Sequence, residues 1–387
     1  MKKIAVISGT RAEYGLLAPV MRRIVDSRSL DLQLIVTASH LLPEFGLTVE
    51  TIERDGFEID RKIVEISRAL NGSDVAHQVG EGTVAFAKAL TELQPDVVLI
   101  LGDRYEMFAA ASAAFFLDIP IMHLHGGELT AGAFDDSIRH VISQLSRVHA
   151  VAAPEYRDRL TRAGAHPDTV HVVGGLGVDS VHHLTLSSRA ELEQELNISL
   201  TGEVFLVTYH PVTRAEHDTK ADVEALISAL DLYPDATVVF TLPNTDPEHQ
   251  KIVEILGLEV VKRNKWFLFP SLGSTKYLSL MTYASVVIGN SSSGFTEAPS
   301  VGTPTVNIGP RQDGRLAAAS VLSCGPQFSE ISETIDRALD KDFIRSIEGS
   351  GSPYGRPGAV EAIVRILEEI PFATLGKRKY YDPPANG

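Results

Sequence analysis

Carboxylates and histidines gather in the first half of the chain, where they could act as general acids and bases. Asp103 follows an apolar run, Asp96–Leu101, and His125 and Glu128 follow a second one, with Asp135 a few residues further on. Unpaired ionisable groups are costly to bury, so packing alone does not explain this set, and proton transfer does. Two other interpretations stay open. Asp103 could cap a helix, and the mixture of residue types could hold a metal, although no His-Glu-x-x-His spacing is present.

Glycine, serine and arginine residues follow other apolar runs and could bind an anion. Gly9-Thr10-Arg11 joins a strand-like run to a helical segment, and Ser291–Ser293 follows a strand-like run in the second half. Backbone N–H groups at such helix starts favour a diphosphate. Glu297 could then accept hydrogen bonds from ribose hydroxyls, and Arg311 adds a cation after a further strand. His210 precedes a proline, which favours extended backbone, and it could be a catalytic group or an ordinary loop histidine.

Strand-like and helical patterns alternate through both halves of the chain. Short apolar runs predict strands, and apolar residues three and four apart predict helices. The expected strands are Lys3–Ser8, Leu32–Thr37, Asp96–Leu101, Ile119–Leu124, Val204–Thr208, Thr237–Thr241, Trp266–Phe269 and Ser285–Gly289. The expected helices are the segment after Arg11, Asp74–Leu93, Tyr105–Leu117, Lys220–Leu230, Thr275–Tyr283 and Ala359–Glu369. The alternation predicts an α/β fold of two Rossmann-like, doubly wound domains with a central cleft.

The domain junction is expected in the glycine-rich and polar stretch 174–202, where the apolar periodicity weakens. The N-terminal domain would span residues 1–180 and be joined by the C-terminal helix and tail, 356–387, while the C-terminal domain would span 200–355. The polar tail after Lys377 is expected to be poorly ordered on its own.

Composition excludes several classes of protein. The chain has 387 residues, a net charge of -15 and one cysteine, Cys324. The excess of acids argues against nucleic acid, whose phosphates are bound by Lys and Arg. No apolar stretch approaches the ~18 residues of a spanning helix, and the first is too short for a signal peptide. A single cysteine excludes an internal disulfide and a cysteine zinc site. We therefore expect a cytoplasmic protein with no membrane partner.

Taken together, the polar segments resemble those of the hydrolysing UDP-N-acetylglucosamine 2-epimerases, the first enzymes of bacterial sialic-acid synthesis. The segments that carry the resemblance are Gly9–Tyr14, Gly102–Glu106, His123–Glu128, Gly289–Gly294 and Gly309–Gln312. The likeness runs from residue 3 to about 370. It implies a glycosyltransferase-B-like fold, a UDP-sugar held largely by the C-terminal half, and a homodimer or homotetramer.

The segment around His125 separates two branches of that family. Non-hydrolysing members typically carry Glu-Ala-Gly-Leu-Arg-Thr where this chain has His125–Thr130, which looks like the hydrolysing branch. Some hydrolysing members read Glu-Gly-Gly-Glu there, and their first Glu is regarded as catalytic. In this chain the role must fall to His125 or pass to Glu128.

The resemblance implies that UDP-N-acetylglucosamine and water give N-acetylmannosamine and UDP, through elimination to 2-acetamidoglucal and hydration, with no metal or other cofactor. The expected catalytic residues are Asp103, Glu128, Asp135, His125 and His210. The expected UDP-sugar-binding residues are Arg11, Arg104, Arg139, Asn244, Asn290, Ser291, Ser292, Ser293, Glu297 and Arg311. The alternatives are the same reaction on UDP-2,4-diacetamido-2,4,6-trideoxyglucose, as in legionaminic-acid synthesis, a nucleotide-sugar glycosyltransferase, and a non-catalytic UDP-sugar sensor.

Overall fold

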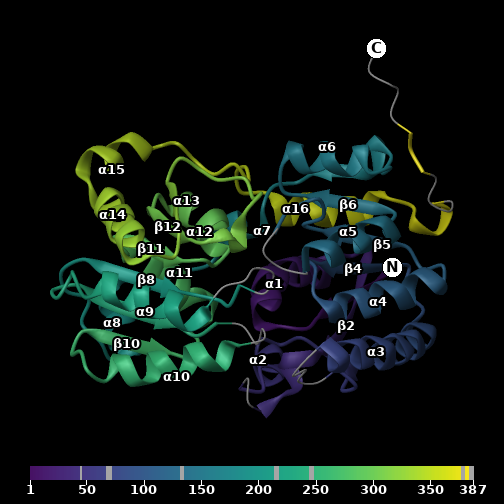
Figure 1. The fold of residues 1–387 in the computed structure, drawn as a ribbon. Coiled ribbons are helices and arrows are strands. Elements are labelled where there is room, and N and C mark those ends of the chain that lie inside the picture. The colour runs from purple at the N-terminus through teal and green to yellow at the C-terminus, as the bar shows by residue number, and fades with distance from the viewer. Residues whose placement is uncertain are drawn as a thin grey trace. The chain divides into compact units, whose positions relative to one another are not determined.

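The computed structural model describes residues 1–43, 46–66, 72–130, 135–212, 218–243, 248–375 and 380–382. The chain divides into two compact units (Figure 1). The first unit contains Met1–Glu128, Asp135–Asp179 and Arg356–Gly387, and the second contains Leu129–Phe134 and Ser180–Gly355. The boundary falls inside a helix, α7 (Leu176–His183), which a second helix, α8 (Arg189–Leu196), follows. The stretch 174–202 is therefore largely helical, and the weak periodicity there reflects short helices. Most of the tail after Lys377 lies outside the described residues.

The first unit is built on a seven-stranded parallel sheet with the order β3-β2-β1-β4-β5-β6-β7. Its strands are β1 (Lys2–Ser8), β2 (Leu30–Thr37), β3 (Arg61–Ile63), β4 (Val97–Leu101), β5 (Ile121–Leu124), β6 (Val148–Val151) and β7 (Val170–Val172). Its helices include α1 (Arg11–Asp26), α2 (Val49–Arg54), α3 (Gly72–Leu93), α4 (Tyr105–Phe116), α5 (Asp135–Leu145), α6 (Pro154–Arg162) and α16 (Ala359–Glu369).

Alternate side chains of β1 show how the sheet is covered on both faces. Ile4 and Val6 join an apolar core with α1, α2 and α16, whereas Ala5 and Ile7 join another with α3, α4 and α5. Strands buried on both faces read as continuous apolar runs. The strand order reverses direction between β1 and β4, so no connecting helix covers the point where their carboxyl ends lie side by side.

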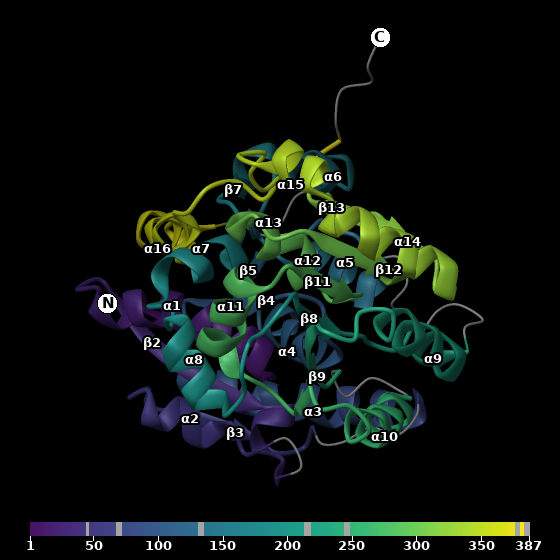
Figure 2. The same ribbon diagram turned by 90° about the vertical axis from the view of Figure 1, so that its left-hand side faces the viewer.

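The second unit repeats this plan with a six-stranded parallel sheet in the order β10-β9-β8-β11-β12-β13. Its strands are β8 (Val204–Thr208), β9 (Thr237–Thr241), β10 (Trp266–Phe269), β11 (Val286–Gly289), β12 (Thr305–Ile308) and β13 (Val321–Cys324). Its helices include α9 (Thr219–Leu230), α10 (His249–Val260), α11 (Gly273–Tyr283), α12 (Ser293–Thr296), α13 (Ala298–Val301), α14 (Phe328–Leu339) and α15 (Lys341–Ile347). Helices α9, α10 and α14 pack on one face of the sheet and follow one another along it in Figure 2. The direction of winding reverses between β8 and β11.

The predicted α/β class with parallel sheets is confirmed in both units, and the expected strands and helices lie within a few residues of the observed ones. The elements that were missed include β3, β7, α6 and α8, which are short or polar, and also the twelve-residue helices α10 and α14. Among the described residues, no helix combines the length and the apolar character needed to span a membrane.

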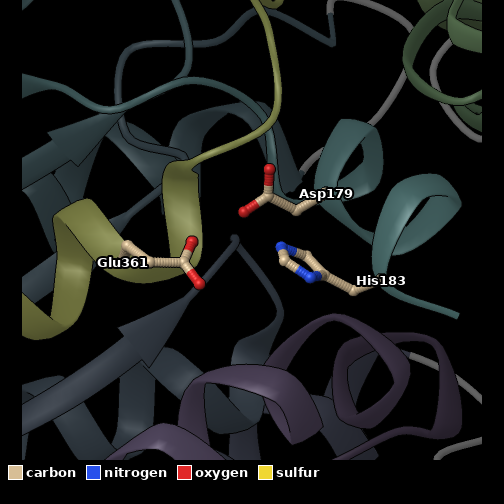
Figure 3. Close-up of side chains that lie close together, drawn as sticks. All are labelled: Asp179, His183 and Glu361. Carbon is tan, nitrogen blue, oxygen red and sulfur yellow. The ribbon is translucent and has the colours of Figure 1, made fainter.

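Helix α16 lies far along the sequence but packs in the first unit, where its yellow ribbon lies among blue elements (Figure 1). Its N-terminus begins after Gly358, which has no side chain to cap it. The buried Asp179 carboxylate takes over this task, because it accepts hydrogen bonds from the backbone N–H groups of Gly358 and Val360, both at 2.7 Å. Figure 3 shows Asp179 facing the first turn of α16, which carries Glu361. The acid thereby ties the returning chain to the first unit.

We predict that Asp179→Ala lowers the free energy of unfolding of the first unit by about 2 kcal/mol, because two backbone donors at a helix N-terminus lose their acceptor. Urea unfolding followed by hydrogen exchange of α16 amides measures this. The control is Asp168→Ala, whose side chain is 88% exposed. Equal stability of the two variants would contradict the capping role.

Candidate active site

Asp103 and Arg139 form an ion pair at the carboxyl end of β4. Arg139 is buried on α5, and Asp135 is the first residue of the same helix, one turn earlier. Asp103 does not cap helix α4, because Arg104 occupies the N-cap position and makes no side-chain capping bond. The Asp103 side chain is therefore available for the chemistry of the strand ends, held by Arg139. Arg139, which the sequence predicts to bind substrate, forms an ion pair with the Asp103 carboxylate in this structure.

His123 hydrogen bonds to the backbone of Gly102, the residue that precedes Asp103. Its ring is fully buried, with Nε2 2.8 Å from the carbonyl oxygen of Gly102 and Nδ1 2.9 Å from the hydroxyl of Ser143. A carbonyl can only accept, so Nε2 carries the proton and Nδ1 accepts from Ser143. Burial lowers the pKa of His123 to about 4, with the Arg139 charge adding to the effect. The neutral ring therefore fixes the backbone next to Asp103 through its two hydrogen bonds. A side chain at Gly126 would lie 2.9 Å from the Ser143 hydroxyl.

The side chains of His125 and Glu128 lie close together at the end of β5. Nδ1 of His125 lies 2.8 Å from Oε1 of Glu128, whose side chain is 1% exposed. His125 has φ +61°, a left-handed conformation that is uncommon for residues other than glycine and often marks functional sites. Among the described residues, no group hydrogen bonds to its buried Nε2 atom.

The turn after β1 carries Arg11, the first residue of α1, whose side chain is exposed. Thr10 and Glu13 form a capping box, in which each side chain binds the other's backbone N–H. After the neighbouring strand, β4, the Arg104 guanidinium donates through Nε to the buried Glu106 carboxylate at 2.6 Å. Glu13 and Glu106 were not predicted as site residues. The sequence signal was present, since an acid next to Arg104 in an apolar helix start is unusual.

His40 was also missed, because it reaches the site from a different strand. It follows β2 and is completely buried, between the Ser8 hydroxyl at 2.9 Å and the Thr48 hydroxyl at 2.7 Å. Burial lowers the pKa of His40 to about 4. It therefore fixes the end of β1 as a neutral side chain.

Asn290 is the centre of the corresponding region in the second unit. Its amide oxygen accepts from the backbone N–H of His210 at 2.6 Å, and its amide nitrogen donates to the carbonyl of His210 at 2.8 Å. The backbone carbonyl of Asn290 accepts from Arg311 at 3.2 Å and from Gln312 at 2.8 Å. We interpret Asn290, expected to bind substrate, as the residue that positions His210 and Arg311. Burial and the Arg311 charge hold the pKa of His210 well below its usual range.

The turn after β11 is tight because a Cβ at Gly289 would lie 2.0 Å from the backbone oxygen of Thr208. Ser293 then donates to the Ser291 hydroxyl at 3.0 Å and shares a 2.7 Å hydrogen bond with the Tyr277 hydroxyl. The helix that starts here, α12, has only four residues. A helix dipole therefore adds less to anion binding than the sequence suggested, and backbone N–H groups and hydroxyls remain.

The remaining predicted residues are distributed as follows. Ser292 is the N-cap residue of α12 and is partly exposed, and Glu297 accepts from the Thr296 hydroxyl between α12 and α13. Asn244 lies outside the described residues. Among the described residues, Asp103, His125 and Glu128 do not bring three ligand atoms together as a metal ion would require.

Comparison with known proteins identifies the family to which the chain is similar. The model of the UDP-N-acetylglucosamine 2-epimerase family matches residues 22–368. The GDP/UDP-N,N'-diacetylbacillosamine 2-epimerase (hydrolyzing) of Campylobacter jejuni is 39% identical over 343 residues, 88% of each chain. The polysialic acid biosynthesis protein P7 of Escherichia coli is 32% identical over 99% of this chain and 98% of its own. The crystal structure of a Neisseria meningitidis UDP-GlcNAc 2-epimerase bound to UDP-GlcNAc superposes with a TM-score of 0.82 at 21% identity, covering 95% of this chain and 99% of that one.

The buried neutral histidines predict an acid-sensitive first unit. An unfolded histidine takes up a proton below its ordinary pKa of 6.5, whereas folded His123 stays neutral until about pH 4. Stability therefore falls as the pH is lowered from 7 to 5, by about 2 kcal/mol for this residue. Urea unfolding, followed by hydrogen exchange of β5 amides, should show a smaller pH dependence in His123→Gln. The exposed His166 provides the control, as His166→Gln. An unchanged pH dependence in His123→Gln would refute the assignment.

Proposed function

Since this chain belongs to the UDP-N-acetylglucosamine 2-epimerase family, as a member of its hydrolysing group, we propose that it converts UDP-N-acetylglucosamine and water to N-acetylmannosamine and UDP. The observation that carries the proposal is the set of acid and base groups at neighbouring strand ends of the first unit: Asp103 after β4, and the adjacent side chains of His125 and Glu128 after β5. A sensor that only binds UDP-sugars would not need them.

The chemistry requires two proton transfers on different faces of the sugar. The hydrogen at C2 is hardly acidic while the sugar is intact, but it becomes acidic as the C1–O bond to UDP breaks. The electron pair of the C1–O bond leaves with UDP, a base takes the C2 proton, and the electron pair of the C2–H bond forms the C1–C2 double bond of 2-acetamidoglucal. Water adds at C1 while an acid delivers a proton to C2 from the opposite face, which gives the manno sugar.

Within this scheme we assign the base to the position of His125. Nδ1 of His125 faces the Glu128 carboxylate at 2.8 Å and would carry the ring proton, which leaves the lone pair of Nε2 to take the C2 proton. Asp103 and Asp135 remain candidates for the opposite proton transfer. In the second unit, Arg311 and Ser291–Ser293 would stabilise the departing diphosphate, with His210 held next to Arg311 by Asn290.

A second substrate has a specific observation in its favour. The Campylobacter relative at 39% identity is named for N,N'-diacetylbacillosamine, which is a 2,4-diacetamido-2,4,6-trideoxy sugar. The C1 and C2 chemistry is the same for both UDP-sugars, so the residues above do not discriminate between them. The two sugars differ in their substituents at C4 and C6, so residues that contact those positions would determine the specificity.

A time course by nuclear magnetic resonance tests both substrates in parallel, in heavy water containing labelled oxygen. We expect release of UDP and a free manno-configured sugar that carries deuterium at C2 and solvent oxygen at C1. Product without either label would rule out elimination and hydration. The sugar with the higher kcat/KM identifies the substrate, and no turnover of either would refute the proposed reaction.

Variants separate catalysis from binding. Asp103→Asn and Glu128→Gln should each lower kcat by about 10²–10⁴ while UDP affinity stays nearly constant, because each removes an acid–base group or its partner. Arg311→Ala should instead weaken UDP binding, measured by calorimetry. Asp118→Asn, whose side chain is 66% exposed, is the control. Near-normal kcat in a carboxylate variant would remove that residue from the mechanism.

A further inference from the structure

Glu106 is a buried carboxylate that the reaction scheme does not use. Its side chain is 0% exposed, and Arg104 Nε donates to its Oε1 atom at 2.6 Å. Among the described residues, no group hydrogen bonds to its other oxygen, Oε2, which is also buried. Burial of a carboxylate costs free energy that its contacts must offset. A residue that existed only to fill space at this helix start would not need the charge.

Glu106 also reaches across the reversal of the winding, from the turn after β4 to the turn after β1. A Cβ atom at Gly9 would lie 2.9 Å from both Cγ and Oε1 of Glu106, so only glycine leaves room for this carboxylate. From the other side, Oε2 of Glu13 accepts from the backbone N–H groups of Gly9 at 2.9 Å and Thr10 at 3.1 Å. Gly9 is thus held between two carboxylates.

The charged and titratable groups that face Glu106 are Arg104, Glu13 and Tyr105. Burial and the neighbouring Glu106 raise the pKa of Glu13 to about 8. A protonated Glu13 removes its repulsion with the neighbouring Glu106 carboxylate, which pairs with Arg104. The Arg104 guanidinium is fork-shaped and rigid, so a bond to Nε fixes the direction of its terminal nitrogens.

We propose that Glu106 is a positioning residue of this site, which holds the Arg104 guanidinium in one direction at the end of β4, next to Asp103. The inference rests on the proposed function for what Arg104 then does, which is to bind the UDP-sugar as the sequence predicts. In this role Glu106, whose side chain is 0% exposed, acts through Arg104. Gly9 and Glu13 keep it in place.

A double-mutant cycle on kcat/KM tests this relation. We expect a loss of about 10-fold for Glu106→Gln and about 100-fold for Arg104→Ala, with the double variant within about twofold of Arg104→Ala, because a residue that acts through another adds nothing once that one is gone. Losses that multiply in the double variant would overturn the proposal. Glu92→Gln, from the exposed Arg61–Glu92 pair at 2.9 Å, is the control and should retain full activity.

A spectroscopic measurement keeps the test independent of turnover. The Nε–H resonance of Arg104, assigned by its loss in Arg104→Lys, should move in Glu106→Gln and stay in place in Glu92→Gln. If Glu106→Gln does not fold, Gly9→Ala provides the second variant, because its methyl group displaces the same carboxylate and should move the same resonance. An unmoved resonance would overturn the proposal. Absence of turnover in the wild type would refute the proposed function alone, since the resonance would still decide the role of Glu106.

Discussion

The reversal of winding between neighbouring parallel strands is the constraint on which both halves of this protein depend. At β1 and β4, and again at β8 and β11, two strand ends lie side by side without a connecting helix over them. In each unit, a side chain from the turn after the later strand crosses to the turn after the earlier one. Glu106 packs against Gly9, and Asn290 pairs with the backbone of His210. These crossing contacts give the strand ends their fixed geometry.

The two crossing contacts differ in chemistry. Asn290 is neutral and satisfies both of its amide groups with one backbone unit, which makes the turn of the second unit rigid without adding charge. Glu106 is ionisable and brings Arg104 with it. The second unit therefore presents backbone N–H groups and hydroxyls from a rigid turn, whereas the first unit presents paired charges. This division agrees with a proposed binding role for one unit and a proton-transfer role for the other.

Much of the fold and of the site could be predicted because both depend on local pattern. Buried parallel strands are apolar runs, and the polar residues that follow them, such as Asp103 and His210, lie at the carboxyl ends of the strands, where open α/β sheets bind ligands. The hydrogen-bond partners of other side chains could not be predicted, because they are distant in the sequence. The fold brings His40 to Ser8, and Asp179 to the N-terminus of α16. Short polar helices such as α8 have too few turns to produce a clear period.

Pairing also changes what the arginines of the first unit contribute. Arg139 lies against Asp103, and Arg104 against Glu106, so two of the three arginines of the first unit that the sequence assigned to the ligand have a carboxylate partner, whereas the Arg11 side chain is exposed. An arginine that is paired with an acid attracts an anionic ligand only weakly, because the two charges largely cancel at the distance of a ligand. Its contribution is the fixed orientation of its hydrogen-bond donors. The net charge of -15 and an anionic substrate are therefore compatible without a strongly positive first unit. In the proposed reaction the first unit supplies proton transfer at fixed positions, and buried ion pairs provide such positions at the cost of desolvation.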